Sequence, residues 1–135
     1  MIKESMVFMY FGGDCRDALN FYRTALGADV IEVVTYEEAG MADSDKEKAL
    51  VMNSTFKLGG VAFCANDVFG SKTIVGNNLS IWLEFDGEES LRETYTRFQG
   101  ASCKIQSEPE ETFWNSVYEK VQDPFGIFWE LNYQK

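Results

Sequence analysis

The sequence predicts an α+β fold made of two βαβββ modules, and two observations carry this prediction. The first is the order of the elements, because each half reads as one strand, one helix and three further strands. The second is an internal similarity at an offset of 73 residues, which the order of elements supports better than the few identities do. The aligned pairs are Ala18 and Leu91, Tyr22 and Tyr95, Gly27 and Gly100, and Ala28 and Ala101. We expect one domain, residues 1–135, with modules at approximately 1–77 and 78–135.

The first helix is predicted to begin at Asp14, which serves as N-cap, with Asp17 in the position of a capping-box acid. Gly27 ends it, because glycine adopts the left-handed conformation without steric cost. Apolar residues at helical spacing form one buried stripe. These residues are Ala18, Phe21, Tyr22, Ala25 and Leu26.

The second helix follows the same logic. Asp86 is the expected N-cap, Glu89 completes a capping box, and Gly100 ends the helix. Its stripe is formed by Leu91, Tyr95 and Phe98.

The remaining apolar runs predict eight strands. They lie at 6–11, 30–36, 49–58, 61–65, 79–85, 102–107, 117–122 and 127–133. Gly59-Gly60 predicts a hairpin between the third and fourth strands. Residues 37–48 read as a solvated loop. Residues 66–77 carry enough apolar side chains to fold over a pocket or a partner subunit.

Composition limits the classes of partner. Twelve basic and twenty-two acidic residues give a net charge of −10, which disfavours nucleic acid and anionic membranes and attracts cations. Acidity that serves only solubility is the alternative reading. No apolar run has membrane-spanning length and no signal pattern opens the chain, so we expect a cytoplasmic protein. The three cysteines are widely spaced and are expected to be reduced thiols.

Glu130 is the leading candidate for a functional residue. It lies in a strongly apolar last strand, where an isolated carboxylate needs a partner or a ligand. Alternation along this strand places Phe128, Glu130 and Asn132 on one face, opposite Trp129 and its neighbours. In the strand from Leu79, the same rule groups Ser80, Trp82 and Glu84. Apolar faces with a few polar groups are typical of small-molecule pockets.

The order of several motifs resembles the glyoxalase, bleomycin-resistance and extradiol-dioxygenase group, the vicinal oxygen chelate superfamily. Within it, the chain is most similar to the PhnB-like branch, often labelled demethylubiquinone methyltransferase-like. The motifs lie at 11–22, 26–27, 57–60, 66–67, 76–80, 114, 123–126 and 129–131. The resemblance implies a glyoxalase-like fold, with paired βαβββ modules in a strongly curved mixed sheet around a cavity. It also implies a homodimer. Nothing in the residues indicates methyl transfer, since no nucleotide-binding glycine loop follows the first strand.

The resemblance also implies where a metal would bind. Metal-dependent members carry ligands, commonly His or Glu, on the first and last strands of each module. The corresponding positions here are Val7, Cys64, Ser80 and Glu130. Only Glu130 is a good hard ligand, and the chain has no histidine. PhnB-like sequences often have His where this chain has Asn53. We therefore expect no metal and no cofactor; an all-oxygen site of Glu130 with Glu84 and Asp67 is the alternative.

Three functions stay open at this point. The first is binding of a small aromatic or cationic molecule in a metal-free cavity. The expected ligand-binding residues are Trp82, Glu84, Trp114, Tyr118, Phe128, Glu130, Asn53 and Cys64. The second is an enzyme, namely a lyase, isomerase or dioxygenase that uses a divalent metal. A metal-free enzyme is also possible, in which Glu130 acts as a general base because burial raises its pKa. The third is a non-catalytic dimeric module whose cavity its own side chains fill.

Each candidate residue also has a structural reading. Glu130 pairs with Lys120 or Arg16, or accepts from a backbone amide. The tryptophans and Tyr118 belong to the core. Glu84 is solvated or paired, and Cys64 is a small buried hydrophobe.

Overall fold

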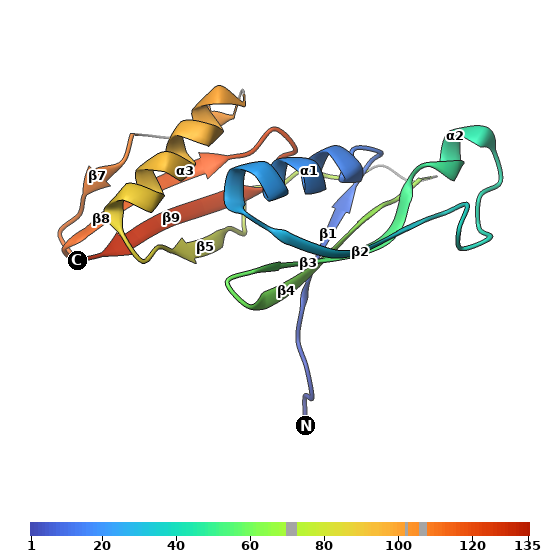
Figure 1. The fold of residues 1–135 in the computed structure, drawn as a ribbon, viewed down its shortest axis with the longest axis horizontal. Helices are drawn as coiled ribbons and strands as arrows, with labels where there is room; N and C mark the ends of the chain where they lie inside the picture. The colour runs from blue at the N-terminus through green and yellow to red at the C-terminus, as the bar shows by residue number, and fades with distance from the viewer. Residues whose placement is uncertain (70–72, 102, 106–107) are drawn as a thin grey trace. The chain divides into compact units, whose positions relative to one another are not determined.

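The computed structural model describes residues 1–69, 73–101, 103–105 and 108–135. These residues form two compact units, Met1–Thr73 and Ile74–Lys135 (Figure 1). Each unit has its own sheet and its own long helix, and each is described by itself below.

Unit 1 consists of a four-stranded mixed sheet and the helix α1. Its elements are β1 (Val7–Phe11), α1 (Cys15–Leu26), β2 (Asp29–Thr35), α2 (Asp45–Lys48), β3 (Val51–Leu58) and β4 (Val61–Asp67). The strand order is β1-β4-β3-β2, with β1 parallel to β4 and the other pairs antiparallel. Six extended residues precede β1, and the N-terminal arm leads away from the sheet in Figure 1.

Unit 2 consists of a five-stranded mixed sheet and the helix α3. Its elements are β5 (Ile81–Glu84), α3 (Glu88–Gly100), β6 (Lys104–Ile105), β7 (Glu110–Glu111), β8 (Ser116–Gln122) and β9 (Phe128–Gln134). The strand order is β5-β9-β8-β6, and β7 also pairs with β8. Strand β5 runs parallel to β9, as β1 does to β4 in unit 1.

The predicted fold class is confirmed. Each unit contains a strand, a helix and then further strands, with the first strand paired in parallel to the last. The small additions are α2, which lies in the stretch expected to be a loop, and β7, which the sequence did not indicate. No helix in the described part of the chain has the length and apolar character needed to cross a bilayer.

Strand bounds differ from the predicted ones by a few residues. The hairpin at Gly59-Gly60 is confirmed, with both glycines at positive φ between β3 and β4. Strand β4 continues two residues beyond the predicted end, to Asp67, and β5 is shorter than predicted, at Ile81–Glu84. The strand expected at 102–107 is described only at Lys104–Ile105, and positions 102, 106 and 107 lie outside the described residues, as do 70–72 of the expected covering loop.

Each long helix buries one stripe against its own sheet. In α1 the fully buried residues include Ala18, Tyr22 and Ala25 as predicted, and the Tyr22 ring lies 5.6 Å from that of Phe56 on β3. Phe21 and Leu26 are only half-buried, and Cys15 and Leu19 take their places in the core. In α3 the predicted stripe of Leu91, Tyr95 and Phe98 is buried, joined by Thr94. The helical spacing was right, and the stripe of α1 is rotated relative to the predicted one.

Both ends of α1 lie where the sequence predicts, but the side chain that satisfies its first N–H groups is a different one. Asp14 is the N-cap residue, yet its side chain makes no capping hydrogen bond. Asp67, at the end of β4, instead accepts from the backbone N–H groups of Gly13 and Cys15, both at 2.9 Å. Its other oxygen accepts from Val51 N at 2.9 Å, so one buried carboxylate joins a helix start to two strands. Gly27 ends the helix at φ 68° as expected.

The predicted N-cap of α3 is wrong, whereas the helix ends at Gly100 as predicted. Gly87 is the N-cap, while Asp86 accepts a hydrogen bond from Ser90 Oγ at 3.1 Å. Gly100 is the last helical residue and Ala101 follows as the C-cap. The sequence repeat therefore extends to the buried stripes of the two helices but not to their ends.

The turn before β9 is held by a second buried aspartate. Asp123 Oδ1 accepts from the backbone N–H groups of Phe125 and Ile127, and Oδ2 accepts from Trp129 Nε1 at 2.9 Å. Gly126 is at φ 97°, and a Cβ there would lie 2.6 Å from a methyl of Val75. This turn fixes the start of β9 and therefore the position of Glu130 in the sheet.

Candidate functional site

Six of the eight sequence-predicted ligand-binding residues lie in unit 2. Register places Trp82 of β5 and Lys120 of β8 beside Glu130, and Glu84 and Tyr118 beside Asn132. Partners in adjacent strands share a face, so these side chains project from one side of the sheet. We call this side the aromatic face. It comprises Trp82, Glu84, Tyr118, Lys120, Phe128, Glu130 and Asn132, together with Trp114 in the turn before β8.

Glu130 is held by two hydroxyl groups. Ser80 Oγ donates to Oε2, and Tyr118 Oη donates to Oε1 at 2.5 Å. Burial alone would raise the pKa of Glu130, but these two hydrogen bonds and the charge of Lys120 outweigh it and lower the pKa below 4.5. The expectation of a raised pKa for Glu130 is therefore wrong. The carboxylate is ionised at neutral pH and is poorly suited to act as a general base.

Glu84 is the second carboxylate of the aromatic face. Its Oε1 accepts from Asn132 Nδ2 at 2.8 Å and from Trp82 Nε1 at 3.2 Å, and its Oε2 accepts from Gln134 N at 2.8 Å. Burial acts to raise the pKa of Glu84, but these three hydrogen bonds lower it overall. No ion pair among the described residues includes Glu84 or Glu130. The face therefore presents two anions held by neutral donors.

Three aromatic rings lie beside these carboxylates. The ring of Tyr118 is 5.9 Å from Trp82 and 5.7 Å from Trp114, the latter edge to face. Trp82 and Trp114 are 48% and 39% exposed. Neither is a core residue, which removes the structural reading for the two tryptophans. Burial and the adjacent Glu130 carboxylate raise the pKa of Tyr118, so its hydroxyl remains a hydrogen-bond donor at neutral pH.

Phe128 lies at the other end of the face from Trp114. The ammonium of Lys120 sits 5.4 Å from the centre of its ring, within cation–π distance. Lys120 is the register partner of Glu130 on the neighbouring strand, and its charge contributes to the low pKa of Glu130.

Asn132 is the residue of this face that the sequence reasoning did not select. Only 2% of it is exposed, and its Nδ2 donates to Glu84 and, at 3.4 Å, to Ser116 Oγ. Its Oδ1 is buried and meets no hydrogen-bond donor among the described residues. An unsatisfied buried acceptor costs about 1–3 kcal/mol, so it calls for a specific explanation. The signal was the alternation along β9, which groups Asn132 with Glu130.

The other two predicted residues, Asn53 and Cys64, belong to unit 1. Register puts both on one face of its sheet, together with Thr55. Asn53 is half-buried, and Cys64 is buried with its Sγ 3.0 Å from Met6 Sδ.

All three cysteines are free thiols. Burial, and secondarily the charge of Asp67, raise the pKa of Cys15 to about 12, which makes it a poor nucleophile.

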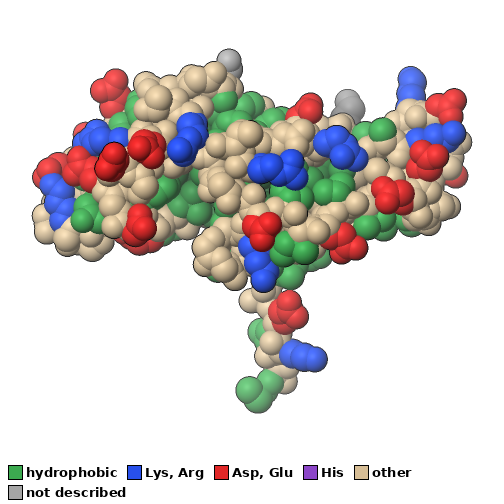
Figure 2. Space-filling model, viewed as in Figure 1, with side chains coloured by type: hydrophobic (Ala, Val, Ile, Leu, Met, Phe, Trp, Pro, Cys, Tyr) green, Lys and Arg blue, Asp and Glu red, His purple; other side chains and the backbone are tan. Residues whose placement is uncertain are grey.

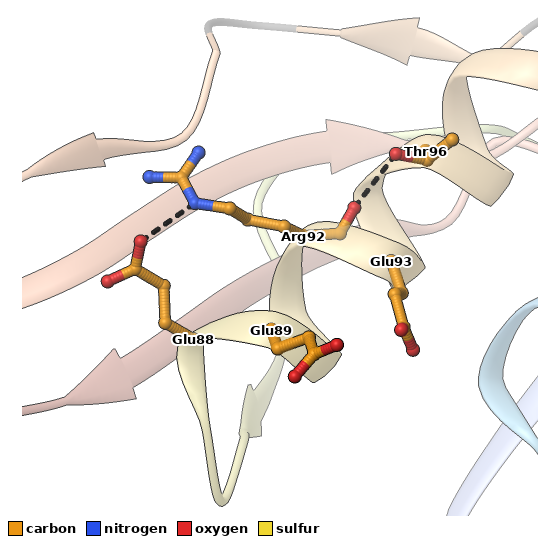
Figure 3. A pocket seen from close by; sticks show the side chains of 5 residues that line it. All are labelled: Glu88, Glu89, Arg92, Glu93 and Thr96. Carbon is orange, nitrogen blue, oxygen red and sulfur yellow. Dashed lines mark hydrogen bonds and ion pairs between the residues drawn. The ribbon is translucent and has the colours of Figure 1, made fainter.

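A hollow of about 480 Å³ lies on α3, and none of the predicted ligand-binding residues lines it. It is lined by Glu88, Glu89, Arg92, Glu93 and Thr96, which follow one another along a single helix (Figure 3). Arg92 pairs with Glu88 at 2.8 Å. Acidic and basic side chains alternate over this helix in Figure 2. Solvated ion pairs account for this surface without a ligand.

The residues present do not fit the divalent metal that the resemblance implies for other members. Ser80 and Glu130, two of the four corresponding positions, are hydrogen-bonded to each other. All three N–H donors on Glu84 and the backbone amides on Asp67 occupy the oxygens of the alternative all-oxygen set. Within the described ranges, no three His, Cys, Asp or Glu side chains gather at one point. The four corresponding positions thus offer one hard ligand, Glu130, where three or four are needed.

Comparison with known families settles the relationship that the motifs indicated. Residues 6–131 match the family described as the Glyoxalase/Bleomycin resistance protein/Dioxygenase superfamily. The chain belongs to this superfamily. Protein YjdN of Escherichia coli K12 is 22% identical over 138 residues, which span 95% of this chain and 93% of YjdN.

Two solved structures share the fold over nearly the whole chain. Protein PA1353 of Pseudomonas aeruginosa superposes with a TM-score of 0.83 at 21% identity, covering 98% of each chain. A Bacillus cereus PhnB protein, described as a putative 3-demethylubiquinone-9 3-methyltransferase, also gives 0.83, at 18% identity, covering 97% of this chain and 99% of its own. The predicted likeness to the PhnB-like branch is thereby confirmed at the level of fold.

Proposed function

We propose that this superfamily member binds a small aromatic cation on the aromatic face of unit 2. One observation carries the proposal: two ionised carboxylates, Glu84 and Glu130, lie beside half-exposed rings and are held by neutral donors rather than by Lys or Arg. A ring-bearing cation would gain both electrostatic attraction to these anions and contact with the π-faces of Trp82 and Trp114. The net charge of −10 attracts the same class of ligand.

The geometry favours binding over catalysis. Both oxygens of Glu130 already accept hydrogen bonds, and its low pKa removes the driving force for taking a proton. A carboxylate in this state acts as a fixed counter-ion. The role of Phe128 and Lys120 is to close one end of the face and to disfavour a second positive charge there.

The test is a fluorescence titration at pH 7 with three ligands of one ring size. Protonated N,N-dimethylbenzylamine is the cation, benzyl alcohol the neutral analogue and benzoate the anion. We expect the cation to bind at least about tenfold more tightly than benzoate. Equal affinity for all three, or no binding of the cation, would contradict the proposal.

Variants locate the binding on the aromatic face. Trp82→Leu should reduce the affinity for the cation about tenfold, because a ring contact is lost. Glu130→Gln should reduce the preference for the cation over benzyl alcohol. Glu89→Gln makes the same charge change on α3, away from the face, and is the matched control. An equal effect of Glu89→Gln would show that only overall charge matters.

A homodimer is part of the proposal. It is supported by Phe8 and Tyr10 on β1, whose rings stack 6.5 Å apart and are 51% and 57% exposed. Strand β1 is also an edge of its sheet, which leaves one side of its backbone free of strand pairing within unit 1.

A further inference from the structure

The buried oxygen of Asn132 defines what the ligand must carry. Asn132 lies on β9 between Tyr118 on one neighbouring strand and Glu84 on the other. Its side chain projects from the aromatic face, where Trp82 and Tyr118 approach each other across β9 to 5.9 Å. The buried, unpartnered Oδ1 therefore belongs to a side chain on the same face of the sheet as the rings that the ligand would contact.

The orientation of this amide is fixed by Glu84. Nδ2 donates to Glu84 Oε1 at 2.8 Å, and turning the amide over would set two acceptors against each other. Ser116 Oγ, the second neighbour of Nδ2, directs its own proton to Gln134 Oε1 at 3.0 Å and is not available to Oδ1. In this arrangement Oδ1 is an acceptor that no described protein group supplies with a donor, and a ligand N–H group is one that could do so.

Resting on the proposed function, we propose that Asn132 is a ligand-binding residue whose Oδ1 accepts a hydrogen bond from an N–H group of the bound cation. The ligand class is then an aromatic ammonium that keeps at least one N–H, a protonated primary, secondary or tertiary amine. A quaternary ammonium satisfies the rings and the carboxylates but leaves Oδ1 without a donor. Glu84 acts here as a positioning residue, because it holds the amide in the accepting orientation.

Two cations that differ by one methyl group test this inference on the whole chain. Protonated N,N-dimethylbenzylamine has one N–H, and benzyltrimethylammonium has none. Titration of tryptophan fluorescence at pH 7 should give a dissociation constant about tenfold lower for the first, the factor supplied by one charge-assisted hydrogen bond. In Asn132→Leu, which keeps the side-chain size without the acceptor, the two constants should become equal within about twofold.

The outcomes separate the inference from the function beneath it. If both cations bind the wild-type chain equally, as when a buried water satisfies Oδ1, the inference is overturned and the proposed function stands. If the tenfold preference persists in Asn132→Leu, the inference is also overturned. If neither cation binds, the proposed function itself fails. Should circular dichroism show Asn132→Leu unfolded, Asn132→Ala, which also lacks a side-chain acceptor, replaces it with the same expected ratio.

Discussion

Glu130 shows how two hydroxyl groups turn a strand carboxylate into a fixed anion. Its pKa is lower in the folded chain than the unperturbed 4.5, so ionised Glu130 stabilises the fold above pH 4.5. This stabilisation is lost as the pH falls through the lowered pKa. Partial exposure keeps it small, about 1 kcal/mol at neutral pH.

We therefore predict that Glu130→Gln unfolds about 1 kcal/mol more easily than wild type at pH 7, and that the difference shrinks as the pH falls below 4.5. Urea unfolding from pH 7 to pH 3 measures it. A difference that grows on acidification would mean that the folded pKa is raised.

The sequence identified Glu130 because a lone acid among large apolar residues is visible in a period-two pattern. The sign of its pKa shift was not predictable, because it depends on Ser80, which is 50 residues away in sequence. Asn132 escaped for a related reason. An asparagine on a strand looks ordinary until its neighbours across two strands leave one of its atoms buried and unpaired.

At the scale of elements, Asp67 connects the start of α1 with β3 and β4. Replacing it with alanine leaves three backbone N–H groups without their acceptor. We predict that Asp67→Ala lowers the free energy of unfolding by about 3 kcal/mol. Asp14→Ala should cost less than about 0.5 kcal/mol, because that side chain makes no capping bond. Thermal and urea unfolding of both variants measures the contrast, and comparable losses would restore Asp14 as the functional cap.

Helix existence, the C-terminal ends of both helices and most of the buried stripes followed from the sequence, while the groups that cap the N-termini did not. A capping box is a local pattern, but the acceptor at the start of α1 is Asp67, which lies 54 residues after Gly13 and 52 residues after Cys15. At α3, a glycine took the N-cap and Asp86 bonded to a side chain one turn inside. Local rules describe what an end is able to do, and packing decides which group does it.

At the scale of the whole molecule, charge and exposed apolar area act in opposite directions. A net charge of −10 on each copy opposes self-association, while Phe8 and Tyr10 favour it. We predict a particle of about twice 15.4 kDa whose association strengthens between about 0.05 and 0.5 M salt, since salt screens the repulsion. Sedimentation velocity at both salt concentrations measures this. A mass of one chain at both salt concentrations would contradict the dimer.

The repeated module was the most predictable property of the whole chain. It needs only the order of the apolar runs and two helical stripes, and both survive small errors in strand bounds. The short elements α2 and β7 escaped because four charged residues and two glutamates carry no apolar period.

The indole of Trp129 is fully enclosed and donates to Asp123, whereas Trp82 and Trp114 stand at the surface. The chain thus contains two optical populations, one insulated from solvent and one open to quenchers such as iodide. The fluorescence of the enclosed Trp129 serves as an internal reference. Ligand binding at Trp82 and Trp114 can therefore be measured against it without an added label.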